Sequence, residues 1–264
     1  MNDTALGVIP GRRSAPIVST TARHPGKLSV CRTLCSTCNL REFCPPCCAL
    51  SRSEINLADR LVFTRLRLRR GESLYLAGDR FTSLYAVGNG FLKTTAILEM
   101  GRDQVTGFSM TGEVLGMDGI EEEKHTCNTV ALEDSDVCAI SFARLQELTM
   151  AIPSLQRHFH IMMSREIVRE HGMMLLLGSM NAEKRMAMFL LNLSKRFAAH
   201  GYSASEFNLR LTREEIGSYL SLTLATVSRI FSRFHERGLI AVRQKFVRIV
   251  DRASLERVIG RAMR

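Results

Sequence analysis

The part of the chain that most constrains its fold is the stretch TREEIGSYLSLTLATVSRIFSRFHERG, which begins at Thr212. Thr212 and Glu215 have the spacing of a capping box, in which each side chain bonds the backbone N–H of the other residue. Ser221–Leu222 form a short turn, Thr223 is placed to cap a second helix, and Gly238 is placed to end it. Two helices joined by so tight a turn predict a helix-turn-helix, whose second helix fits the major groove of DNA.

The second of these helices, expected to end near residue 237, would carry the DNA-reading side chains. The exposed positions near its start are Thr223, Ala225, Thr226, Ser228 and Arg229. The positions expected to face the core are Leu222, Leu224, Val227 and Ile230. Beyond the helix, apolar runs at 239–242 and 246–250 flank a polar turn, which predicts the hairpin of a winged helix.

Positive charge gathers in the same third of the chain. Residues 181–264 carry 16 Lys and Arg against 7 Asp and Glu, whereas residues 1–180 carry 20 against 19. A basic module attached to a nearly neutral body indicates nucleic-acid binding, although a solvated basic surface has the same composition.

The beginning of the chain carries no sign of export. Residues 1–30 are broken by prolines and lack the charged start and apolar core of a signal peptide, so we expect a disordered tail there. The longest apolar run, 186–191, is too short to cross a bilayer. We therefore expect a cytoplasmic protein without membrane contact.

Residues 60–145 alternate short apolar runs with turns that contain glycine. The runs expected to be strands are 74–76, 84–87, 91–97, 105–108 and 137–140. Short strands at this spacing predict an antiparallel roll or barrel.

From Pro153 to about Gly178 the apolar residues follow helical spacing instead. Steps of four and three residues mark a coiled-coil seam, whose positions are Met163, Ile167, Glu170, Met174 and Leu177. Glu170 is the only seam position that is not apolar. At a two-fold helix interface Glu170 would face its own copy and oppose pairing, or it would reach out to water at a loosely packed point.

Six of the eight cysteines lie in CRTLCSTCNLREFCPPCC, residues 31–48. In a reducing compartment, thiols at this density indicate a metal ion or an iron–sulfur cluster. The spacing alone does not separate a zinc site with four thiolates from an iron–sulfur cluster, and a thiol–disulfide switch is a third alternative.

Together these parts resemble the CRP/FNR family of bacterial transcription regulators, over about residues 31–250. The motifs that carry the resemblance are GESLYLAGD (71–79), SLYAVGNGFLK (83–93), QVTGFSMTGEVLGMDGI (104–120), NAEKRMAMFLLNLSKRFAAHGYSASEFNLRLTREEIGSYLSLT (181–223) and TVSRIFSRF (226–234).

The resemblance implies an α+β fold with three folded parts. An antiparallel β-roll, like that of cyclic-nucleotide-binding domains, is expected at 51–150, followed by a dimerisation helix at 151–180. A winged helix-turn-helix is expected at 181–264. The disordered tail at 1–30 and a cluster-binding cysteine segment at 31–50 would precede the roll.

Within the family, the cysteine spacing is similar to that of the FNR branch, the fumarate and nitrate reduction regulators. That likeness implies a [4Fe-4S] cluster, and the ligands it implies are Cys35, Cys38, Cys44 and Cys138. Cys127 is the rival of Cys138 for the fourth position. The same resemblance implies that the cluster promotes a homodimer without oxygen and that oxygen destroys it. Glu170, with Ile167, would keep the cluster-free chain monomeric.

The resemblance also implies the partners. They are a near-palindromic promoter site in double-stranded DNA and RNA polymerase, which the loop at 99–103 would contact. Ala225 stands where the FNR-type recognition helix carries Glu, so discrimination at one base pair should relax by about 1–3 kcal/mol.

Other effectors and activities fit the residues less well. Residues 121–129 hold three glutamates and lack the arginine that binds a cyclic phosphate, so we expect no cyclic nucleotide. Haem ligation by one of the histidines is a minor alternative; the candidates are His125, His158, His160 and His171. The sequence shows no nucleophile–base motif and no phosphate-binding glycine loop, so we do not expect an enzyme.

Overall fold

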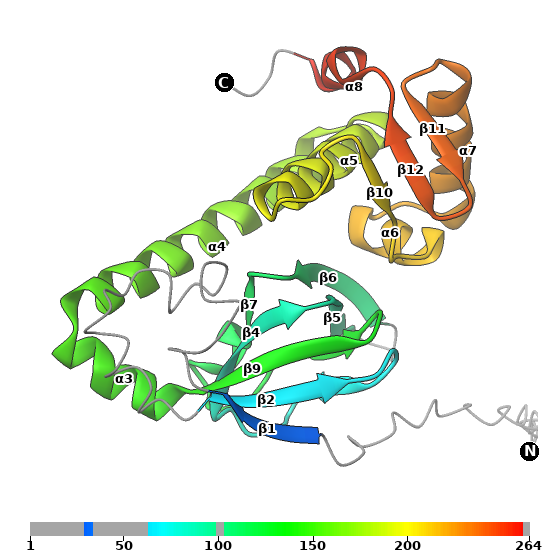
Figure 1. Ribbon diagram of the computed structural model, residues 1–264. Helices are drawn as coiled ribbons and strands as arrows, with labels where there is room; N and C mark the ends of the chain where they lie inside the picture. The colour runs from blue at the N-terminus through cyan, green and yellow to red at the C-terminus, as the bar shows by residue number, and fades with distance from the viewer. Residues whose placement is uncertain (1–28, 34–62, 99–102, 261–264) are drawn as a thin grey trace, which may run out of the picture.

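The computed structural model of the protein describes residues 29–33, 63–98 and 103–260 (Figure 1). Three of the four expected cluster ligands, Cys35, Cys38 and Cys44, lie outside these ranges. So does most of the loop at 99–103 that was expected to contact RNA polymerase.

The first part of the described chain is an antiparallel β-roll made of two sheets. One sheet has the strand order β1 (Ser29–Thr33), β2 (Phe63–Leu68), β9 (Ser135–Ser141), β4 (Ser83–Asn89) and β7 (Val114–Leu115). The other has the order β3 (Ser73–Tyr75), β8 (Asn128–Ala131), β5 (Phe91–Ile97) and β6 (Asp103–Met110). A short 3-10 helix, η3 (Met117–Gly119), follows β7. The predicted roll is confirmed.

Several elements were missed from the sequence. Strand β2 reads FTRLRL, in which Leu66 and Leu68 are buried and Arg67 is exposed, so arginines interrupt its apolar pattern. Helix α3 (Phe142–Ala151) was not predicted: it begins at the end of the range 60–145 expected to hold strands and extends beyond it. Ser29 and Val30, assigned to the disordered tail, belong to β1, which is held by pairing with β2.

A long helix, α4 (Pro153–Ser179), leads from the roll to the C-terminal unit, where α5 (Ala182–Ala199) begins (Figure 1). Pro153 stands in the first turn of α4, where its missing N–H costs nothing. Asn181 caps α5 by accepting from the Lys184 N–H over 3.0 Å. Among the described residues no helix is long and apolar enough to span a membrane.

The C-terminal unit is a winged helix-turn-helix, as predicted. Its further elements are β10 (Glu206–Asn208), α6 (Arg213–Leu220), α7 (Leu224–Glu236), β11 (Ile240–Arg243), β12 (Phe246–Ile249) and α8 (Arg252–Ile259). Both capping-box bonds form, from the Glu215 N–H to Thr212 Oγ1 (3.1 Å) and from the Thr212 N–H to Glu215 Oε2 (2.8 Å). A Cβ at Gly217 would lie 2.6 Å from the Leu222 carbonyl oxygen, so the tight turn requires glycine at this position.

The roll and the C-terminal unit share one buried core. Phe91, Val105, Phe108 and Met110 of the roll lie in the same apolar cluster as residues of α5, α6 and α7. Figure 1 shows α6 beside the β5–β6 edge of the roll. The C-terminal unit is therefore docked on its own roll.

Candidate nucleic-acid interface and sensor site

The start of α7 carries a line of side-chain hydrogen bonds on its exposed face. Thr223 Oγ1 accepts from the Thr226 N–H (3.2 Å) and lies 2.9 Å from Thr226 Oγ1. Arg229 Nη2 in turn donates to Thr226 Oγ1 over 3.3 Å. Because residues three apart lie on one face of a helix, this line holds the Arg229 side chain along the helix surface.

The other positions of α7 largely follow the prediction. Ala225 is exposed and Ser228 is half-buried, whereas Val227 and Ile230 are buried. The prediction for Leu224 was wrong, because its side chain is 54% exposed. Leu224 is the first residue of α7, and it lies beyond the buried stripe that starts at Val227.

Two arginines at the far end of α7 already have a carboxylate partner. Glu183, in the first turn of α5, forms ion pairs with Arg233 and, at 3.5 Å, with Arg237. These two positive charges are therefore partly neutralised within the protein.

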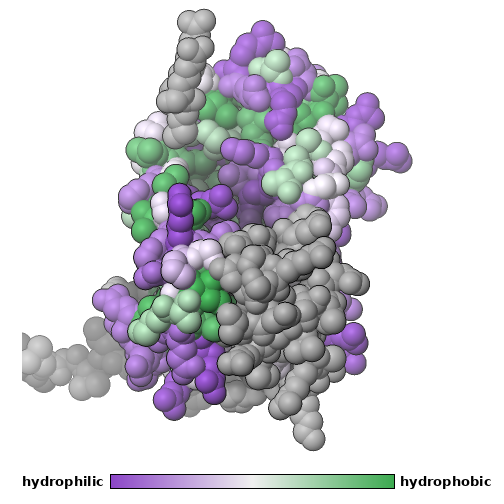
Figure 2. Space-filling view, turned by 60° about the vertical axis from the view of Figure 1, so that its left-hand side comes forward, coloured by the Kyte–Doolittle hydropathy of each residue, from purple (hydrophilic) through white to green (hydrophobic). Residues whose placement is uncertain are grey.

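Only some of the predicted seam positions of α4 are exposed to solvent. Ile167 (53% exposed) and Met174 (71%) are open, whereas Met163 is half-buried and Leu177 packs against the protein's own core. The sequence reading missed three exposed apolar residues of α4, which are Ile161, Val168 and Leu175. They lie seven residues apart, so a second heptad register could have revealed them. Hydrophobic patches interrupt the polar surface on the side of the molecule turned forward in Figure 2.

Cys138 lies on β9, the strand that leads directly into α3. In the sheet register Cys138 is opposite Arg65 of β2, and Arg65 is opposite Cys31 of β1. Cys138 packs against an apolar cluster that includes Leu145 of α3 and Leu155 of α4. Cys138 therefore belongs to the apolar packing that joins the sheet to α3 and to the first turn of α4.

Cys127 has a different environment, inside the roll. It is 8% exposed, and its thiol donates to Asp118 Oδ2 over 3.1 Å. Burial, reinforced by Asp118, raises the pKa of the Cys127 thiol. Burial also acts to raise the Asp118 pKa, but hydrogen bonds from His125 and Cys127 outweigh it and lower that pKa to about 2.

His125 completes this internal cluster. It is 2% exposed, its Nδ1 lies 3.4 Å from Asp118 Oδ1, and its ring stacks on Tyr75 with 3.7 Å between centroids. Within the described ranges no three His, Cys, Asp or Glu side chains are grouped as metal ligands. The contacts of His125 with Tyr75 and Asp118 make it a packing and hydrogen-bonding residue of the roll.

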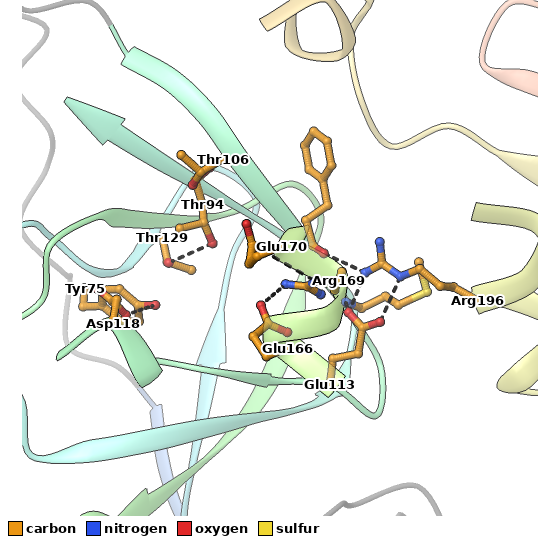
Figure 3. A network of polar contacts seen from close by, with 12 residues as sticks. Tyr75, Thr94, Thr106, Glu113, Asp118, Thr129, Glu166, Arg169, Glu170 and Arg196 are labelled. Atoms are coloured by element: carbon orange, nitrogen blue, oxygen red, sulfur yellow. Dashed lines mark hydrogen bonds and ion pairs between the residues drawn. The ribbon is translucent and has the colours of Figure 1, made fainter. Parts of the chain in front are cut away.

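A cavity of about 310 Å³ lies between the roll and α4. Its lining includes Asp118 and, from α4, Glu166, Arg169 and Glu170. Arg169 bonds Glu166 and lies 3.9 Å from Glu170 Oε1, and Figure 3 shows the three side chains together at the roll surface. Burial raises the pKa of Glu166, an effect that Arg169 partly offsets.

Comparisons with known proteins agree with this arrangement. Residues 65–151 match the cyclic nucleotide-binding domain family, and residues 184–258 match the Crp-like helix-turn-helix domain family. The transcriptional regulatory protein btr of Bordetella pertussis is 47% identical over 226 residues, which cover 86% of this chain and 93% of that protein. The fumarate and nitrate reduction regulatory protein of Escherichia coli K12 is 38% identical, over 87% of this chain and 92% of that protein.

A solved structure shows the same architecture. FixK2 from Bradyrhizobium japonicum matches with a TM-score of 0.70 and 28% identity, over 77% of this chain and 100% of that chain. Members of the family are DNA-binding transcription regulators and not enzymes. The protein therefore belongs to the CRP/FNR family of transcription regulators, and within it to the FNR type.

Proposed function

We propose that the protein is an oxygen-responsive transcription regulator whose [4Fe-4S] cluster is held by four cysteines. The ligands are Cys35, Cys38, Cys44 and Cys138. When bound, the cluster supplies the oxygen-sensitive element. Without oxygen the protein pairs along α4 as a homodimer and presents two copies of α7 to a near-palindromic promoter site.

The observation that carries this proposal is the place of Cys138. Cys138 packs against apolar residues that include Leu145 of α3 and Leu155 of α4. Binding of an iron–sulfur cluster to Cys138 would therefore affect the packing of α3 and of the first turn of α4. Cys127 is the weaker ligand, because a thiol with a raised pKa stays protonated and metal binding requires the thiolate. This difference supports Cys138 as the fourth ligand.

The dimer surface supports the same mechanism. Helix α4 has an exposed apolar face, which consists of Ile161, Ile167, Val168, Met174 and Leu175. Only contact with a partner would bury this face away from water. Glu170 lies at the side of this face, near Arg169. Repulsion between two copies of Glu170 is modest, on the order of 1 kcal/mol, but it is enough to tip a balanced monomer–dimer equilibrium.

The cavity between the roll and α4 does not suit a cyclic nucleotide. Its lining brings together the carboxylates of Asp118, Glu166 and Glu170, and Arg169 is already engaged by Glu166. A cyclic phosphate would be repelled there. The exposed Ile97 and Leu98, at the end of β5, offer a contact surface for RNA polymerase.

The test is anaerobic purification with iron and sulfide analysis. We expect a brown protein with about four iron and four sulfide per chain, whose visible absorption bleaches in air while the dimer dissociates. A colourless protein with stoichiometric zinc would replace the sensor by a structural metal site. A metal-free protein whose dimerisation follows thiol oxidation would replace it by a thiol switch.

A further inference from the structure

We propose that Arg65 of β2 is a positioning residue for the iron–sulfur cluster, and that its guanidinium stabilises the negative charge of the bound cluster. The inference rests on the proposed function, because it takes Cys138 as a cluster ligand. Arg65 is itself neither a cysteine nor a ligand. Three features of the sheet support this role: the register of the strands, the hydrogen bonding of the guanidinium and the charge around it.

Strand β2 lies between β1 and β9, and Figure 1 shows the three strands side by side. Arg65 is directly opposite Cys138 of β9 and, on its other side, directly opposite Cys31 of β1. Cys31 precedes the proposed ligand Cys35 by four residues. Directly opposite residues of an antiparallel pair rise from the same face of the sheet, with Cβ atoms about 4.5–5.5 Å apart. Arg65 is therefore an immediate neighbour of Cys138 on one face of the sheet.

The guanidinium of Arg65 is held in place, but one of its donors is unused. Arg65 Nη2 donates to Asp136 Oδ2 over 3.0 Å, which fixes one side of the planar group. Arg65 Nε is buried, and it has no hydrogen-bond partner in the part of the chain that the structure describes. A buried donor on a charged group is costly to leave unpaired. An acceptor that binds beside Cys138 would remove this cost, and the sulfur atoms of a cluster accept hydrogen bonds.

The charge around Arg65 also favours a negatively charged group. Asp136 pairs with Arg65 and, at 3.5 Å, with Arg67. Because two arginines share one carboxylate, these three residues keep a net positive charge on the face that carries Cys138. The side chain of Arg65 is 32% exposed, whereas that of Arg67 is 72% exposed. Water screens Arg67 more strongly, so Arg65 is the arginine whose charge should act on the cluster.

A positive charge beside the cluster should have two measurable effects. The reduction potential of an iron–sulfur cluster depends on its net charge, on hydrogen bonds to its sulfurs and on its exposure to solvent. Arg65 should raise this potential, because a positive charge stabilises the reduced and more negative state. Loss of a residue that supports a metal ligand from outside typically lowers metal affinity by about 10–100-fold. Replacement of Arg65 should therefore also let a chelator remove the iron faster.

The experiment compares Arg65→Gln with Arg67→Gln as a matched control. Both variants lose one positive charge and one ion pair with Asp136, but only Arg65 is opposite Cys138. Each full-length protein is loaded with the cluster without oxygen and titrated with dithionite, while electron paramagnetic resonance reads the reduced cluster. A second sample is mixed with EDTA, and its visible absorption is followed. Arg65→Gln should have a lower potential than Arg67→Gln and the wild type, and it should lose its absorption about tenfold faster.

A conservative variant separates charge from packing. Arg65→Lys keeps the positive charge, so its potential should return to near the wild-type value, whereas a role in packing alone would not follow the charge. Circular dichroism of the metal-free proteins checks that each variant folds. If Arg65→Gln does not fold, Arg65→Met, which keeps an unbranched apolar stem, is measured in its place with the same expected result.

The outcomes distinguish this inference from the proposed function. A potential and a rate of iron loss equal to those of Arg67→Gln would overturn the role of Arg65 and leave the proposed function standing. A wild type that assembles no cluster would overturn the proposed function, and the role of Arg65 with it.

Discussion

Arg229 Nη2 donates a hydrogen bond to Thr226 Oγ1, the same oxygen that lies 2.9 Å from Thr223 Oγ1. The guanidinium is therefore directed before DNA arrives. Preorganisation of this kind reduces the conformational entropy lost when the arginine binds a base.

Arg229→Gln should lower affinity for the cognate half-site by about 1–3 kcal/mol, because an arginine pairs bidentately with guanine. Thr226→Val, which keeps the shape but removes the hydroxyl, should cost less and should act only when Arg229 is present. The measurement is a double-mutant cycle of binding to cognate duplexes. Additive effects of the two substitutions would show that Thr226 does not direct the arginine.

Glu170→Ala should raise the dimer fraction of the cluster-free protein in air, because it removes a like-charge contact of about 1 kcal/mol. Val168→Glu, on the exposed apolar face of α4, should lower the dimer fraction even with the cluster bound. Sedimentation velocity measures both. An unchanged monomer–dimer equilibrium in Glu170→Ala would remove this carboxylate from the switch.

The two cysteines of the roll should respond differently to replacement by serine. Cys138→Ser should abolish the visible absorption of the anaerobic protein, whereas Cys127→Ser should retain it. In the folded wild type, Cys127 should also resist alkylation by iodoacetamide at pH 8, because its burial and its raised pKa leave little thiolate. Tryptic mass mapping reads the alkylation, and rapid labelling of Cys127 would contradict this description of the site.

Glu215 should make the stability of the folded protein depend on pH in the acidic range. Burial alone would raise its pKa, but Lys93 and the Thr212 backbone lower it below the usual value of 4.5. A carboxyl whose folded pKa is lowered stabilises the fold above its unfolded pKa and loses that effect as the pH falls through the folded pKa. Glu215→Gln should therefore be less stable than the wild type at pH 7, and the difference should shrink below about pH 4.5. Thermal unfolding at the two pH values measures this.

The sequence predicts some of these features well because they depend on local chemistry. The capping box at Thr212 is set by residues three apart, and it forms as expected. Strand β2 escaped prediction because its alternating arginines are stabilised by pairing with β9, across about seventy residues of chain. Leu224 was predicted to face the core because it lies at the same helical spacing as Val227 and Ile230. Its side chain is exposed because the buried stripe of α7 begins only at Val227.

The site residues depend still more on the tertiary structure. The resemblance to the FNR branch identified Cys138 as a candidate, but its packing against an apolar cluster shared by α3 and the first turn of α4 follows from the tertiary structure. The ion pairs between Lys93 and Glu215 and between Arg196 and Glu113 join residues more than eighty positions apart. No pattern within one segment contains that information.

The pairing of Glu183 with Arg233 and Arg237 bears on how the protein should respond to salt. The slope of affinity against salt concentration counts the cations that a protein releases from DNA, and an arginine already paired with a carboxylate releases less. The DNA-binding unit should therefore behave as a less basic module than its composition suggests, with a shallow salt dependence. Its selection of a promoter would then rest more on the few bases read by the start of α7 than on attraction to the phosphates.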